Sequence, residues 1–230
     1  MPLKFICLSD THAQVPPKAD ERDVTAWLHA GDFCNMGLKT ADYARLRRIE
    51  IWAKQRRVPI LAVLGNHDCG HGTDFLRKCA HDITGKVVQV APHFFVAGIG
   101  WCGIRFFDLP DEAALRPVCE KVLTRARFEM SAGDHCILLT HYPAYLPLLF
   151  PCDGDRAGFM FDCVREVIDV LKPLAVIQGH AHHLFASLGL FKTGGHDVVI
   201  ANPGPDGGLL TVDEEKPIAV FEPWLPVPRR

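Results

Sequence analysis

Apolar, strand-like runs recur along this chain of 230 residues, and five of them end in aspartate, asparagine or histidine side chains. The five polar ends are Asp10 with His12 after residues 4–9, Asp32 after 24–30, Asn66 with His67 and Asp68 after 59–64, His141 after 136–140, and His180 with His182 after 174–178. In open α/β sheets, binding sites form beyond the carboxyl ends of the strands. A layered sheet structure would therefore bring these groups to one place.

Further strand-like runs and three helical patterns complete the chain. The helical patterns cover residues 40–56, 111–130 and 158–171, and the later strand-like runs lie at 86–99, 184–191, 197–202, 209–213 and 218–222. Several early strands are apolar on both faces, as buried strands in a layered protein are. The order predicts an α/β (α+β) fold in which two stacked mixed β-sheets are flanked by helices. We expect a single domain over residues 1–222 and a proline-rich tail over 223–230.

Composition narrows the class of protein. Hydrophobic residues make up 48% and charged residues 23% of the chain, and the net charge is −2. No basic block stands out, so a duplex nucleic-acid partner is not expected. The longest apolar region, ILLTHYPAYLPLLF, is interrupted by histidine and proline, and no membrane association is expected. The start of the chain lacks a secretory signal pattern, and nine scattered cysteines without a C-x-x-C pair indicate a reducing cytoplasm.

The residue types at the strand ends suit transition metals. Carboxylate oxygens, imidazole nitrogens and an amide oxygen together favour Mn, Fe, Zn, Ni or Co over calcium. They are too many for one tetrahedral zinc ion, whereas two ions about 3.5–4 Å apart that share a carboxylate would use them. In Asp10-Thr11-His12 and His180-Ala181-His182, both outer residues would point the same way if the segment is extended. Taken singly, Asp10 also fits a turn cap, and His141 fits a hydrogen-bonded structural histidine.

The five motifs, in this order, resemble those of the calcineurin-like metallophosphoesterase superfamily. The matching residues are Asp10-Thr11-His12, Gly31-Asp32, Gly65-Asn66-His67-Asp68, His141 and Gly179-His180-Ala181-His182. Together they form a specific signal, although each alone is weak. The S-D-T-H and H-A-G-D-F forms are most similar to the small metallophosphoesterase-domain and cyclic-nucleotide phosphodiesterase groups.

The resemblance implies a four-layer αββα sandwich with a binuclear metal centre. Matched by position, Asp10, His12 and His182 would hold the first metal, Asn66, His141 and His180 the second, and Asp32 would bridge both. The ions would be divalent or trivalent, with manganese expected first and Fe, Zn, Ni or Co as alternatives.

The resemblance also assigns two catalytic residues. His67 would contact the phosphate and protonate the leaving oxygen, while Asp68 would orient the His67 ring. Two cations neutralise the phosphodiester and lower the pKa of a shared water, so that a bridging hydroxide attacks opposite the leaving group. An imidazole titrates in the range that a proton donor near neutral pH needs.

Substrate contacts are expected on the loops around these motifs. The candidates are His71 in the CGHGT segment, Phe107 within residues 101–111, and Tyr142 and Arg156 in the long segment after His141. An aromatic ring would stack on a base, and an arginine would meet a phosphate. For each of them an ordinary loop role is the competing interpretation.

The expected function is hydrolysis of small phosphodiesters, with cyclic nucleotides among the candidates. The partner is a small phosphodiester or nucleotide, and homo-oligomerisation is left open. The alternatives are a phosphomonoesterase, including a protein phosphatase, and a single-strand nuclease, since the same metals serve all of them. A non-enzymatic scaffold, like the retromer subunit of this fold, fits poorly because no expected metal position is missing.

Overall fold

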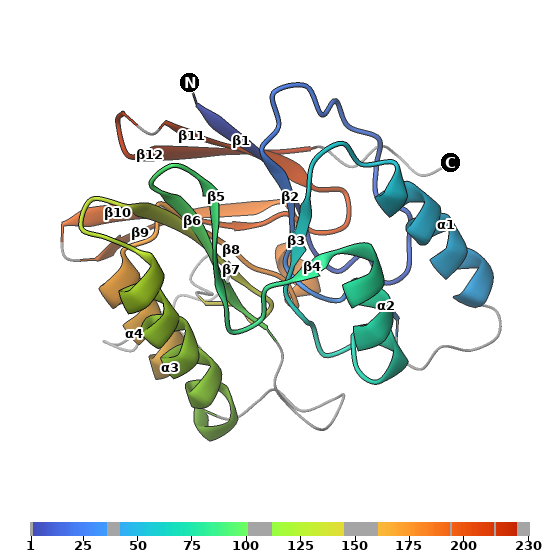
Figure 1. Ribbon diagram of the computed structural model, residues 1–230, viewed down its shortest axis with the longest axis horizontal. Coiled ribbons are helices and arrows are strands. Elements are labelled where there is room, and N and C mark those ends of the chain that lie inside the picture. Colours follow the sequence, from blue (N-terminus) through green and yellow to red (C-terminus); the bar gives the residue numbers. More distant parts are fainter. Residues whose placement is uncertain are drawn as a thin grey trace.

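The computed structural model contains two six-stranded β-sheets that face each other, with helices on their outer sides (Figure 1). It describes residues 2–35, 42–100, 112–144, 161–193, 195–213 and 215–224. Within these ranges, α1 and α2 lie on one side of the pair of sheets and α3 and α4 on the other. The expected four-layer αββα sandwich is confirmed.

The first sheet joins the N-terminal strands to the last two strands of the chain. Its order is β12 (Ile218–Pro223), β11 (Gly208–Asp213), β1 (Leu3–Leu8), β2 (Ala26–His29), β3 (Ile60–Ala62) and β4 (His81–Asp82). The strands β1 to β4 run parallel to one another, whereas β11 is antiparallel to both of its neighbours, β1 and β12. The carboxyl ends of β1, β2 and β3 therefore meet at one edge of this sheet.

The second sheet also contains four adjacent parallel strands. Its order is β5 (Val87–Ala91), β6 (Phe94–Ile99), β7 (His135–Thr140), β8 (Ala175–Ile177), β10 (His196–Asn202) and β9 (Ser187–Thr193). The four central strands are parallel, and the two edge strands are antiparallel to them. The carboxyl ends of β7 and β8 are thus adjacent, as the polar strand ends require.

Each helix buries one apolar stripe against a sheet. The helices are α1 (Asp42–Lys54), α2 (His71–Cys79), α3 (Glu112–Glu129) and α4 (Asp162–Leu171), with a single 3₁₀ turn at His182–Leu184. Leu46 and Ile49 of α1 are buried, as are Val164 and Val167 of α4, so the expected periodicity is confirmed where side chains are described. Pro117 lies in the second turn of α3, where it removes one backbone hydrogen bond of the helix.

Helix α2 and the two-residue strand β4 are not predicted from the sequence. Two glycines, Gly70 and Gly72, make the start of α2 resemble a loop. The helix forms nonetheless because Leu76 is completely buried against the first sheet. Burial of an apolar face outweighs the weak helix propensity of glycine at this end.

The main core lies between the sheets, where Phe5 of β1 stacks on Phe94 of β6 with ring centroids 6.0 Å apart.

The expected tail at 223–230 begins inside the fold, because Pro223 ends β12 and the Trp224 amide donates to Gly207 O over 2.9 Å. Residues 225–230 lie outside the described ranges. Among the described residues, no helix combines the length and apolar character that a membrane crossing needs.

Candidate metal centre

Loops after five strands, β1, β2, β3, β7 and β8, converge at the carboxyl edge of both sheets. Backbone hydrogen bonds fix their positions: the Asp10 amide donates to Gly31 O over 2.9 Å, and the His12 amide to Asp32 O over 3.0 Å. The loops after β7 and β8 are joined in the same way, since the Gly179 amide donates to His141 O over 3.2 Å. The loops are therefore tied to each other by main-chain contacts before any side chain is considered.

One group of side chains gathers around Asp10. Asp10, His12, Asp32 and His182 each offer a ligand atom within 4.8 Å of the others. The two Nε2 atoms of His12 and His182 are 3.1 Å apart, and Nε2 of His182 lies 3.5 Å from Oδ1 of Asp10. The two carboxylates are buried, whereas His182 is exposed. This group is open to solvent on the side of His182.

A second group shares Asp32 with the first. Asp32, His141 and His180 also place ligand atoms within 4.8 Å of one another. The Oδ1 atom of Asn66 lies 2.9 Å from Nε2 of His141 and 3.0 Å from Nδ1 of His180. The structure thus brings together all seven residues expected to bind metal, in two groups with Asp32 between them.

Hydrogen bonding of His141 tests whether these residues suit a cation. Its Nδ1 atom donates to Ala30 O over 2.8 Å, which leaves the lone pair of a neutral ring on Nε2. That lone pair faces the oxygen of Asn66 at 2.9 Å. Two acceptors directed at one another are stabilised by a cation between them, and a carbonyl that accepts from the far ring nitrogen is typical of metal-binding histidines. The residues present therefore fit a divalent metal pair.

Burial lowers the pKa of two imidazoles of the candidate centre, His180 and His12. Burial, with the nearby His141 ring as a smaller cause, lowers the pKa of His180 to about 4. Burial also lowers the pKa of His12, although Asp32 opposes the shift. Because a metal binds the unprotonated ring, both shifts favour ligation at neutral pH.

The ligand loops adopt left-handed backbone rather than the extended form expected from the D-x-H and H-x-H spacing. Positive φ angles occur at Asp10 (52°), His12 (45°), Asp32 (55°) and His180 (66°). His182 starts the 3₁₀ turn, and neighbouring His183 is exposed. The alternation argument is therefore wrong, and tight turns gather these side chains instead. Such backbone costs about 1–3 kcal/mol for each residue and concentrates at functional sites.

Three motif glycines make room for the ligands. A Cβ atom on Gly31 would meet the ring of His141, and one on Gly65 would meet the backbone nitrogen and Oδ1 of Asp32. A Cβ atom on Gly179 would lie 2.6 Å from Ala30 O. The glycines of the three motifs are therefore required by close approach of one ligand loop to another.

Comparison with known proteins identifies the family of this site. A family model described as calcineurin-like phosphoesterase matches residues 3–184, which include every proposed ligand. The chain belongs to this family. No curated protein sequence matches the chain. A phosphoesterase of this family hydrolyses phosphoric esters, in agreement with a candidate centre of aspartate and histidine side chains.

Solved structures show the same fold at low sequence identity. The crystal structure of TT1561 of Thermus thermophilus is 18% identical, with a TM-score of 0.59, and the match covers 96% of this chain and 98% of that one. A second crystal structure is 14% identical, with a TM-score of 0.58, and covers 97% and 99% of the two chains. At these identities the likeness supports the calcineurin-like fold.

His67 of this calcineurin-like phosphoesterase borders the centre without joining either ligand group. Its amide donates to Oδ1 of Asp32 over 2.8 Å, and its Nε2 atom lies 4.0 Å from Oδ2 of the same residue. Its ring meets that of His12 edge to face, with centroids 4.7 Å apart. The side chain is 24% exposed, so one part of the ring remains open to a substrate.

Asp68 does not hold the His67 ring, and that expectation is wrong. Its carboxylate accepts backbone N–H bonds from Gly65 at 2.9 Å, Phe33 at 3.2 Å and Cys34 at 2.7 Å. Nδ1 of His67 has no hydrogen-bond partner among the described residues. The completely buried Asp68 therefore fastens the loop after β2 to the loop after β3, because three main-chain donors outcompete one ring nitrogen.

The expected substrate contacts are only partly placed. His71 is exposed and is the first residue of α2. Tyr142 is not a rim residue: it is 1% exposed and packs edge-on against His141, with ring centroids 5.3 Å apart. Its ring turns into the core beneath α3 and α4, which explains the difference. Phe107 and Arg156 lie outside the described residues.

One buried residue that supports the centre is not identified from the sequence. Asn202, at the end of β10, accepts a hydrogen bond from the Ser9 hydroxyl over 3.3 Å. Its amide donates to Ala181 O over 3.1 Å. It therefore links the segment before Asp10 to the residue between His180 and His182. The only signal in the sequence is its position at the end of a strand, before Pro203 and Gly204.

Proposed function

We propose that this calcineurin-like phosphoesterase is a binuclear metal-dependent hydrolase of small phosphodiesters. The observation that carries the proposal is the position of Asp32, which belongs to both ligand groups while His67 lies beside it outside them. A carboxylate between two cations can bind both of them. An imidazole beside the cations can donate a proton to the leaving group.

The protein residues would divide the work as follows. Asp10, His12 and His182 hold one cation, Asn66, His141 and His180 hold the other, and Asp32 lies between them. Bound cations supply charge neutralisation at the phosphate and a lowered pKa for water. Manganese is the first candidate, with Fe, Zn, Ni and Co as alternatives.

His67 would act on the leaving oxygen. When water adds to phosphorus it gives up one proton to solvent, the bond from phosphorus to the leaving oxygen breaks, and that oxygen takes the proton carried by the His67 ring. Solvent then returns a proton to the ring. The Nε2 atom is placed for this role because it faces the centre at 4.0 Å from Asp32. The His67 amide, hydrogen-bonded to Asp32, fixes the backbone from which the ring projects.

The seven described cysteines are all free thiols, which supports the proposed cytoplasmic location. The described residues include every member of both ligand groups, so a scaffold with a decayed site receives no support from the structure.

Hydrolysis of bis(4-nitrophenyl) phosphate by the purified protein, loaded separately with each candidate metal, tests the proposal. We expect turnover with Mn²⁺ and loss of turnover after chelation. Parallel assays with 4-nitrophenyl phosphate, a cyclic nucleotide and single-stranded DNA separate a diesterase from a monoesterase and a nuclease. Absence of diester turnover with all of Mn, Fe, Co, Ni and Zn would refute it.

A further inference from the structure

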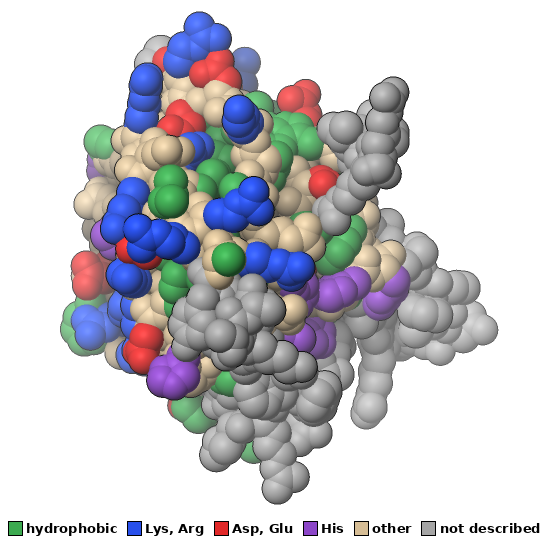
Figure 2. Space-filling view, turned by 90° about the vertical axis from the view of Figure 1, so that its right-hand side faces the viewer, with side chains coloured by type: hydrophobic (Ala, Val, Ile, Leu, Met, Phe, Trp, Pro, Cys, Tyr) green, Lys and Arg blue, Asp and Glu red, His purple; other side chains and the backbone are tan. Residues whose placement is uncertain are grey.

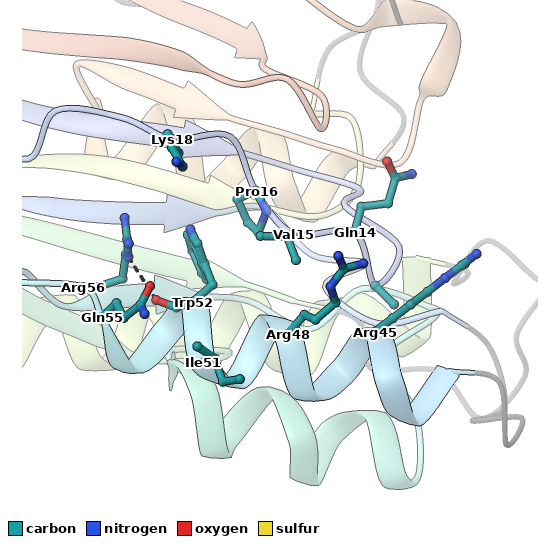
Figure 3. Close-up of a pocket in the computed structure, with 11 residues that line it drawn as sticks. Gln14, Val15, Pro16, Lys18, Arg45, Arg48, Ile51, Trp52, Gln55 and Arg56 are labelled. Carbon is teal, nitrogen blue, oxygen red and sulfur yellow. Dashed lines mark hydrogen bonds between the residues drawn. The ribbon is translucent and has the colours of Figure 1, made fainter. Parts of the chain in front are cut away.

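A hollow of about 770 Å³ lies between residues 13–18 and one face of α1 (Figure 3). Arg45, Arg48 and Trp52 project from that face at spacings of three and four residues, so they form one stripe along the helix. Ala13 and Lys18 belong to the opposite wall. The hollow is thus built by a helix face and an adjacent loop.

The lining is strongly basic. Lys18, Arg45 and Arg48 are exposed and form no ion pair within the described part of the chain, and no acidic residue is among those that line the hollow there. Arg56 is different, since it pairs with Glu21 at 3.2 Å and lies over the Trp52 ring at 5.1 Å. Figure 2 shows Lys and Arg side chains gathered on this face, with histidine side chains at its edge. Three uncompensated cations thus surround the hollow.

Trp52 adds a second, independent observation. The side chain is 6% exposed, and its indole N–H has no hydrogen-bond partner among the described residues. Figure 3 shows the ring rising from α1 toward the loop that contains Pro16. A buried donor without an acceptor is rare in proteins, because an unmade hydrogen bond is costly. Trp52, which lines the hollow beside the three cations, therefore has a buried donor without an acceptor among the described residues.

One turn of the chain, at His12 and Ala13, joins the candidate metal centre to the wall of the hollow. Ala13 follows the proposed ligand His12, so their Cα atoms are about 3.8 Å apart. The turn is fixed because the Gln14 amide donates to Thr11 O over 2.8 Å and the Ala13 amide to Phe33 O over 3.0 Å. One side of this turn presents His12 to the centre, and the other begins the wall of the hollow.

We propose that this hollow is a subsite for a second phosphate group on the substrate, on the arm that remains attached to the phosphorus after cleavage. The proposal rests on the proposed function, since it takes the first phosphate to be at the metal centre. Paired guanidinium groups three residues apart on a helix suit a phosphate, because arginine donates two parallel hydrogen bonds to its oxygens. The preferred substrates are then phosphodiesters whose nucleoside or sugar carries another phosphate.

Three chromogenic substrates test the subsite. They are thymidine 5′-(4-nitrophenyl phosphate) with a free 3′-hydroxyl, the same diester with a 3′-phosphate, and the same diester joined through its 3′-phosphate to a second thymidine. We expect kcat/KM to be about tenfold higher for the two substrates that carry a second phosphate, as two exposed charge contacts would give. The third substrate shows whether a terminal phosphate or one within a chain is preferred.

The double variant Arg45→Glu/Arg48→Glu should abolish this preference. Its matched control is Arg125→Glu/Arg127→Glu, which reverses two exposed arginines of α3 and should keep the preference. Thermal melts check that both variants are folded. A preference retained in Arg45→Glu/Arg48→Glu, or equal kcat/KM for all three substrates in the unmodified protein, would overturn the subsite.

A binding measurement separates the subsite from the proposed function. Calorimetry on the metal-loaded protein compares thymidine 3′,5′-bisphosphate with thymidine 5′-phosphate, and we expect a Kd about tenfold lower for the bisphosphate. This difference should vanish in Arg45→Glu/Arg48→Glu. If it is present while no diester is hydrolysed, the proposed function fails and the subsite stands; if diesters are hydrolysed and the two Kd values are equal, only the subsite fails.

Discussion

The Nε2 atom of His141 lies 2.9 Å from Oδ1 of Asn66, while the other ring nitrogen of His141 is engaged by Ala30 O. The pair therefore presents two acceptors to one point, which is the arrangement that a cation binds. Asn66→Ala should reduce the metal content from two ions to one and lower kcat at least about a hundredfold. Asn66→Asp, which keeps an oxygen at this position, should retain two ions. Elemental analysis of the purified variants checks both outcomes, and two retained ions in Asn66→Ala would exclude the assigned ligand.

Substitution of Asp32 and of His67 by alanine should have different effects on metal content and turnover. Asp32→Ala removes the carboxylate shared by both groups, so both ions and all turnover should be lost. His67→Ala should keep both ions and lower kcat by about 10²–10⁴, the usual contribution of a general acid. Metal analysis and steady-state kinetics separate the two effects, with His81→Ala as the control for an exposed histidine. Unchanged kcat in His67→Ala would contradict the proton-donor role.

Asp68 should matter first for stability. Asp68→Ala leaves the buried amides of Phe33, Cys34 and Gly65 without an acceptor, so the free energy of unfolding should fall by about 3 kcal/mol or more. Asp68→Asn should lose less, since the amide oxygen still accepts. Urea denaturation monitored by tryptophan fluorescence measures both. If Asp68→Ala kept its stability and lost only kcat, the orienting role rejected by the geometry would be restored.

The strand-end pattern draws attention to Asp10, Asp32 and His141, and the resemblance to the calcineurin-like family assigns these and the other proposed ligands to two metals. The role of Asp68 is predicted wrongly because the sequence His67-Asp68 is the same whether the carboxylate accepts from the neighbouring ring or from three backbone amides. Helix α2 is missed because Gly70 and Gly72 hide a helix that tertiary burial of Leu76 stabilises. Asn202 is missed because its two partners, Ser9 and Ala181, are distant in sequence. The left-handed turns are likewise a product of loop packing.

Gly65 should tolerate no side chain. Gly65→Ala places a methyl group against the backbone and carboxylate of Asp32, so we expect at least about 2 kcal/mol of destabilisation together with loss of metal. Gly133→Ala is the matched control, because Gly133 has a φ of 95° but nothing within 4 Å of an added Cβ atom. It should cost about 1 kcal/mol through backbone strain alone and keep its metals. Equal metal content in both variants would show that crowding at Gly65 is unimportant.

The thiol of Cys79 should react slowly at neutral pH. Burial, with the charge of Glu50 as a smaller cause, raises the pKa of Cys79 to about 11. Since the thiolate is the reactive form, alkylation at pH 8 should proceed at roughly a hundredth of the rate of an ordinary exposed thiol. The rate should rise as the pH approaches 11 and rise at once in urea. Peptide mass spectrometry after iodoacetamide treatment follows this residue, and rapid native labelling at pH 8 would contradict the shift.

The left-handed backbone at His12 and His180 has a consequence for the history of the chain. Glycine would adopt both conformations without the strain of about 1 kcal/mol or more that a histidine carries there. If only the stability of the fold were selected, residues other than histidine would be favoured at these two positions. A lineage that had abandoned its chemistry would be expected to show the loss here first. The presence of both rings at strained positions agrees with their use in the proposed metal centre.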